Sequence, residues 1–132
     1  DALDNYRSAL ELCGKISSES ISLTANSVDE SGTTFSNGLV EYATGTIAGK
    51  QILADCGFFG IIVPQQYGGL NFPATIYTMM IEIVSRADAS LMTLFGYQDI
   101  GEAVARLAPR SLSEELLPKY CRGELTGAMV LT

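Results

Sequence analysis

The stretch of sequence that decides the fold is residues 57–69, which read GFFGIIVPQQYGG. An apolar run closed by Pro64 is followed by Tyr67 and two glycines. Glycine tolerates a positive φ, so the pair lets the chain turn after Tyr67, whose ring we expect to pack against neighbouring helices. No Lys-Ser or Lys-Thr follows the glycines, which argues against a phosphate-binding loop. We interpret residues 57–70 as a structural loop between helices.

Helical periodicity surrounds this loop. Gly57 fits the position just beyond a helix end, and Asn71 could cap the next helix. Ser111 and Glu114 have the spacing of a capping box, whereas Pro118 should end or kink the last helix early. The polar segment 26–38 is predicted to be a long loop. Apolar residues at three- and four-residue spacing predict helices over residues 2–25, 39–56, 74–87, 89–97, 99–107 and 111–121.

The predicted helix over residues 74–87 is apolar on almost all sides, which is typical of the buried centre of a bundle. Glu82 is its one interior acid, and we expect a paired or partly exposed structural side chain there.

Residues 125–132 are rich in β-formers and predict the start of a strand. A lone strand has no ladder partner, so it would pair with another copy or with strands beyond Thr132. The predicted fold class is therefore all-α: a helical bundle with the start of one β-strand at the C-terminus. We expect residues 1–122 to form an all-α domain and residues 123–132 to be the first strand of a truncated β-domain.

Composition excludes several classes of function. The chain has 132 residues, a net charge of −7 and only eight Lys and Arg, which disfavours nucleic-acid binding. It contains no histidine, the usual general base and metal ligand. Three cysteines without a C-x-x-C pair predict neither a disulfide framework nor a zinc site. No apolar run approaches the ~20 residues of a membrane span. By residue chemistry alone, the chain is a scaffold or a binding wall.

Residues 63–69, VPQQYGG, resemble a motif of the N-terminal helical domain of the acyl-CoA dehydrogenase family. The resemblance extends over residues 53–132. Two departures are Gln65 and Gln66, where the family has acids, and residues 108–113, which lack a Gly-Thr-x-x-Gln-Lys pattern. Further family features occur in the same order at Glu82, residues 86–90 (RADAS), Gly96, residues 117–118 (LP), residues 123–124 (GE) and residues 131–132 (LT).

The resemblance implies an oxidation of an acyl-CoA thioester across its α and β carbons, with hydride transfer to FAD. It also implies that the catalytic carboxylate lies downstream of this chain, so an isolated fragment would be inactive and would not be expected to hold FAD alone. The chain would form one wall of the acyl pocket and one flank of the flavin site. By resemblance, the flavin-contacting residues are Met129, Leu131 and Thr132, and the substrate-contacting residues are Thr93, Gly96, Tyr97 and Ile100.

The resemblance further implies an electron-transfer flavoprotein as acceptor and a homo-oligomeric parent enzyme. Its location would be the bacterial cytoplasm or, in a eukaryote, the mitochondrial matrix. Two alternatives stay open: an acyl-CoA oxidase or related flavoenzyme of the same fold, and a non-catalytic helical interaction module. The acyl group is open as well.

Overall fold

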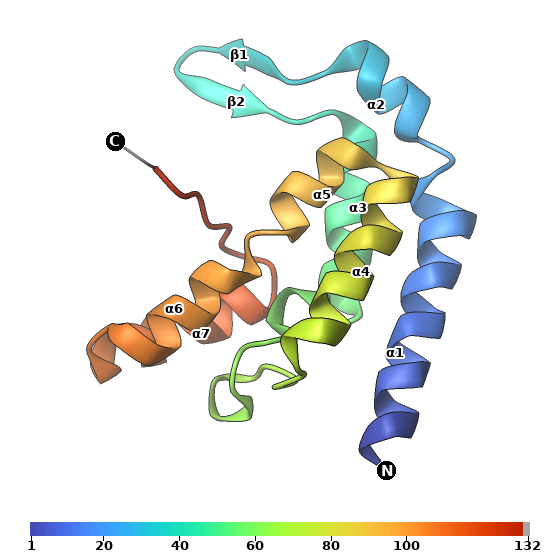
Figure 1. Ribbon diagram of the computed structural model, residues 1–132. Helices are drawn as coiled ribbons and strands as arrows, with labels where there is room; N and C mark the ends of the chain where they lie inside the picture. The colour runs from blue at the N-terminus through green and yellow to red at the C-terminus, as the bar shows by residue number, and fades with distance from the viewer. Residues whose placement is uncertain (131–132) are drawn as a thin grey trace.

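The computed structural model describes residues 1–130 and is mostly helical, which confirms the all-α prediction (Figure 1). Helices α1, α3, α4 and α5 form the larger part of the bundle, and α6 and α7 form a pair beside it. The helices are α1 (Ala2–Ile16), α2 (Ala25–Ser31), α3 (Thr44–Asp55), α4 (Ala74–Ala87), α5 (Ala89–Phe95), α6 (Gln98–Leu107) and α7 (Arg110–Cys121).

The first predicted helix, residues 2–25, is shorter and less regular than expected. Asp1 caps α1 through its side chain, which accepts a hydrogen bond from the Asp4 amide. After Ile16 the chain widens into a π-helical turn, Ser17–Ile21. The Ser18 hydroxyl donates to the Lys15 carbonyl, and the Ser22 hydroxyl donates to the Ser18 carbonyl. Such local bonds compete with regular helix, which explains the break.

The prediction of a loop over residues 26–38 and a helix from Leu39 was wrong. The segment instead contains α2 and a hairpin of β1 (Thr34–Ser36) and β2 (Leu39–Glu41). Asn37 and Gly38 form its turn with φ values of 52° and 80°. Positive φ at both central residues is the geometry that an Asn-Gly hairpin turn requires. Helix α3 consequently begins at Thr44.

Helix α4 supplies the centre of the core, as its apolar sequence predicts. Tyr77, Met80 and Val84 are buried on it. The carboxylate of Glu82 is exposed and lies 4.0 Å from the guanidinium of Arg86, so it is paired as expected. Asn71 does not cap α4, contrary to prediction: Pro73 precedes the helix and Asn71 is exposed at φ 54°. The core also contains Cys13, Ile21, Leu53, Phe58, Phe59, Ile61, Leu91 and Phe95.

Two predictions about the last helix were wrong. Helix α7 begins at Arg110 without a side-chain cap, so Ser111 lies inside the helix and forms no capping box. Pro118 does not end the helix, which continues to Cys121. The amides of Arg122, Gly123 and Glu124 donate to carbonyls of the last turn, which closes the helix beyond the proline. Residues 125–130 pair with no strand in the described part of the chain.

Candidate functional site

The junction between α5 and α6 holds two of the predicted substrate residues, Gly96 and Tyr97. The Tyr77 hydroxyl donates to the Gly96 carbonyl, and the Tyr120 hydroxyl donates to the Tyr97 carbonyl at 2.7 Å. Burial raises the pKa of Tyr77 to about 12 and also raises the pKa of Tyr120. Both phenols therefore stay protonated at neutral pH and act as hydrogen-bond donors. The junction is held from two sides, by α4 and by α7.

Gln98 joins this junction to the apolar stretch at residues 57–63. Its side chain is fully buried. Its Oε1 accepts from the Ile61 amide at 3.0 Å, and its Nε2 donates to the Phe58 carbonyl. Buried main-chain groups need such partners because this stretch makes few regular helical hydrogen bonds. The sequence analysis missed Gln98, because nothing in the sequence distinguishes it from its polar neighbours Asp99 and Glu102.

The paired glycines have different structural roles. Gly68 has a φ of 88°, which favours glycine. Gly69 is needed for space, because an added Cβ would lie 2.0 Å from the Val63 carbonyl oxygen. Tyr67 is half-buried and packs against the cluster of Val63, Leu117, Tyr120 and Cys121, as predicted. The turn is therefore structural.

Ile100, a predicted substrate residue, and Met129, a predicted flavin residue, lie close together. They line a hollow of about 560 Å³ between α6 and the C-terminal segment. Asp99 is the one charged side chain in its lining, and an added Cβ on Gly127 would lie 2.7 Å from Ile100 Cδ1. Leu131 and Thr132 lie outside the described residues. The remaining lining residues are Ala103, Val104, Leu107, Ala108, Ala128 and Val130.

Thr93 lies apart from that hollow. It lines a second one of about 290 Å³, which is bordered by α2, the end of the hairpin, α3 and α5. Its hydroxyl donates to the Ser90 carbonyl at 2.7 Å. Gly96 is half-buried and Tyr97 is 39% exposed. The four predicted substrate residues are thus divided between the helix junction and two separate hollows.

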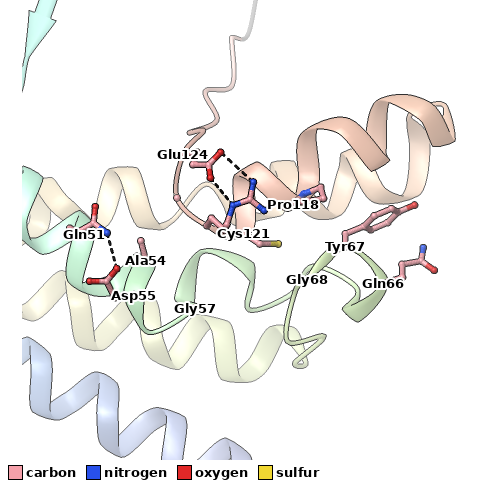
Figure 2. Close-up of a pocket in the computed structure, with 12 residues that line it drawn as sticks. Gln51, Ala54, Asp55, Gly57, Gln66, Tyr67, Gly68, Pro118, Cys121 and Glu124 are labelled. Atoms are coloured by element: carbon pink, nitrogen blue, oxygen red, sulfur yellow. Dashed lines mark hydrogen bonds and ion pairs between the residues drawn. The ribbon is translucent and has the colours of Figure 1, made fainter.

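A third hollow, about 820 Å³, lies between the C-terminal ends of α3 and α7 and the turn at residues 66–68 (Figure 2). Its charged groups are already partnered: Gln51 Nε2 donates to Asp55 Oδ1 at 2.7 Å, and Arg122 Nε donates to Glu124 Oε1 at 2.6 Å. The hydrogen bond from Arg122 lowers the pKa of Glu124.

Cys121, the remaining candidate for chemistry in this hollow, is a poor nucleophile, since burial raises the pKa of its thiol. The hollow therefore contains no activated thiol, and both of its carboxylates, Asp55 and Glu124, already accept hydrogen bonds. The sequence analysis did not anticipate this hollow, because three segments distant in sequence form it.

Over residues 1–130, no cluster of three or more Cys, Asp or Glu side chains is arranged to hold a metal ion, and the sequence has no histidine. The helices described by the structure include none that is both long and apolar enough to cross a membrane.

Comparison with known proteins gives one family. A model described as "Acyl-CoA dehydrogenase, N-terminal domain" matches residues 17–124. The very long-chain specific acyl-CoA dehydrogenase of Homo sapiens is 34% identical over 84 residues, which cover 62% of this chain and 13% of the human protein. The 3-methylmercaptopropionyl-CoA dehydrogenase of Ruegeria pomeroyi is 31% identical over 88 residues, which cover 67% of this chain and 15% of the Ruegeria protein.

A third relative, the 2-methylacyl-CoA dehydrogenase of Solanum tuberosum, is 28% identical over 85 residues, covering 62% of this chain and 20% of its own length. The chain thus spans a fifth or less of the length of these relatives.

Proposed function

Because the chain belongs to the acyl-CoA dehydrogenase family, we propose that it is the N-terminal part of an FAD-dependent enzyme that oxidises an acyl-CoA thioester between its α and β carbons. The match to the N-terminal domain over residues 17–124 carries this proposal. Residues 1–122 are then the all-α domain, and residues 123–132 begin a β-domain whose other strands supply the missing ladder partners.

The proposed role of this chain is to form one wall of the acyl pocket. The hollow of Ile100 and Met129 supports this role, because its lining is almost entirely apolar and an acyl chain gains free energy by leaving water. Gly96 and Tyr97, immediately before Ile100, are held by tyrosine hydroxyls and would present a fixed surface. Thr93 would contact substrate only where the acyl chain also runs along α5.

The proposed flavin flank is Met129 with Leu131 and Thr132. The side chain of Met129 is 53% exposed beside an apolar wall, which fits one side of a flat aromatic ring. When bound, FAD would supply the hydride-accepting chemistry. The residues of this chain would orient the acyl group and exclude water from the reacting carbons. As the family resemblance implies, the carboxylate that removes the α proton would come from another part of the whole enzyme.

The remaining features of the proposal follow from the family. They are an acyl-CoA substrate, an electron-transfer flavoprotein as acceptor, a homo-oligomeric enzyme and a location in the bacterial cytoplasm or mitochondrial matrix. An acyl-CoA oxidase of the same fold is the second candidate, and reaction of its reduced flavin with oxygen distinguishes it. A non-catalytic helical module is the third candidate, in which the apolar C-terminal segment would pair between copies.

The test is the visible spectrum of the parent protein that contains this chain. We expect a yellow protein whose flavin absorbance is bleached by acyl-CoA without oxygen. Rapid return of the colour in air would indicate an oxidase, and a colourless protein would contradict both enzymes. Ile100→Ala should change the preferred acyl length, whereas Ile47→Ala, an exposed isoleucine on α3, should not.

A further inference from the structure

The hairpin carries large apolar side chains that the bundle leaves uncovered. Phe35 and Val40 are direct cross-strand partners and therefore project from the same face. Their exposed fractions are 74% and 57%, and Leu39 on the opposite face is 67% exposed. Figure 1 shows β1 and β2 at the edge of the molecule, extending away from α2 and α3. Exposed apolar groups gathered in this way mark interaction surfaces.

The hollow that contains Thr93 lies at the base of this hairpin. Its walls combine apolar groups, such as Val28 and Leu94, with hydroxyls, such as those of Thr33 and Ser90. Asp29 is the one charged side chain in the lining. Among residues 1–130, no ion pair involves its carboxylate. The hollow therefore offers an apolar slot with one free negative charge at its edge.

The sequence segment that contains the hairpin carries charges of one sign only. Residues 16–49 contain no Lys or Arg, and their four acids are Glu19, Asp29, Glu30 and Glu41. Helix α5, which forms the other wall of the hollow, carries no charged residue. An acidic, apolar surface favours a partner with the complementary pattern and repels anions.

We propose that the hairpin and its hollow bind a segment of another protein in which an aliphatic or aromatic residue is flanked by Lys or Arg. The apolar side chain packs on Phe35 and Val40, and the cation enters the hollow towards Asp29. An anionic membrane surface and the phosphates of CoA are both repelled by this face. A second copy would bring two acidic faces together. The proposal does not rest on the proposed enzyme activity.

The test uses a fluorescein-labelled peptide of alternating Lys and Leu, titrated with the parent protein that contains this chain and followed by fluorescence anisotropy. We expect binding that weakens as salt is raised. The double variant Phe35→Ser/Val40→Thr should weaken binding about tenfold or more, as expected for a lost apolar anchor. Asp29→Asn should weaken it roughly fivefold and reduce the salt dependence. The matched control is Glu19→Gln, which removes an exposed acid outside the hollow and should leave affinity within about twofold.

A second measurement locates the site. Peptide-induced amide shifts in an NMR spectrum should fall within residues 28–46 and 89–94. Shifts spread over the whole chain, or equal binding by the hairpin double variant, would overturn the proposal. Equal binding of a Glu-Leu peptide would overturn the charge argument. Displacement of the peptide by decanoyl-CoA, or a Phe35-dependent dimer in sedimentation, would assign the face to substrate or to a second copy and would also overturn it.

Discussion

The apolar stretch and the hairpin at residues 34–41 both lie between helices, but residues 58–63 of the stretch are buried and the hairpin is exposed over its whole length. The first is held by side chains distant in sequence, above all Gln98. The second is held by its Asn-Gly turn and three cross-strand pairs. The buried stretch therefore contributes to the stability of the bundle, whereas the exposed hairpin contributes little to it. We therefore expect stability to respond strongly to changes in the first and weakly to changes in the second.

The largest effect is expected at Gly69. Gly69→Ala places a methyl group against the Val63 carbonyl oxygen, and the backbone must shift. We expect a loss of about 4 kcal/mol in the free energy of unfolding, measured by urea denaturation, or failure to fold. Gly68→Ala is the matched control: it meets nothing within 4 Å but requires a positive φ, and should cost about 1–2 kcal/mol. Equal losses in the two variants would contradict the conclusion that Gly69 is needed for space and Gly68 for its positive φ.

The next effect tests the hydrogen bonds that the Gln98 side chain makes to the buried stretch. Gln98→Ala leaves the Ile61 amide and the Phe58 carbonyl without their partner in a buried site. The unfolding free energy should fall by about 2–4 kcal/mol, since each unsatisfied group costs about 1–3 kcal/mol. Gln66→Ala changes an exposed glutamine in the same region and should alter stability by less than about 0.5 kcal/mol. A small effect at Gln98 would show that water replaces its amide.

The third effect is a fall in the free energy of unfolding at alkaline pH. The pKa of Tyr77 is about 12 in the folded chain and ~10 in an unfolded one. Below pH ~10 both the folded and the unfolded state keep the proton, so this group gives stability no dependence on pH there. From there to about pH 12 only the unfolded state releases the proton, and stability falls. Tyr77→Phe should cost about 1 kcal/mol at neutral pH and flatten this decline. Thermal unfolding of both proteins from neutral pH to about pH 12 measures the loss at neutral pH and the alkaline decline. An equally steep decline in Tyr77→Phe would show that Tyr77 does not cause it.

The smallest effect is expected in the hairpin. Phe35→Ser removes a side chain that is 74% exposed and should change the unfolding free energy by less than about 0.5 kcal/mol. Phe59→Ser, at a fully buried position, should cost about 3–5 kcal/mol. Chemical denaturation of the two variants gives the contrast directly. A loss above about 1 kcal/mol at Phe35 would show that the hairpin contributes to the core.

The two regions also differ in how well the sequence predicted them. Helical periodicity located the helix over residues 74–87, because a long apolar pattern leaves few alternatives. Strands of three residues are too short to show alternation, so the sequence pattern around Asn37 and Gly38 predicts only a loop. Gln98 was missed because its partners, Phe58 and Ile61, are distant in sequence and no spacing rule relates them.

The sequence names residues for the candidate site but does not show how they are arranged in space. Ile100 and Met129 do line one hollow, a result that depends on the C-terminal segment folding back along α6. Thr93 lies elsewhere because α5 ends at Phe95 and the chain changes direction before α6 begins at Gln98. Periodicity places residues on a face of one helix, but it does not specify the angle between two successive helices.

The charge pattern of the hairpin region has a consequence for how its accessibility can be followed. Trypsin cleaves after Lys and Arg, and the sequence offers it no site between Lys15 and Lys50. The most exposed segment of the chain should therefore stay intact in a tryptic digest, however accessible it is. Chymotrypsin, which cleaves after large apolar residues, has Phe35, Leu39 and Tyr42 in the same segment. The ratio of chymotryptic to tryptic cleavage thus measures whether the hairpin is covered, without labelling the chain.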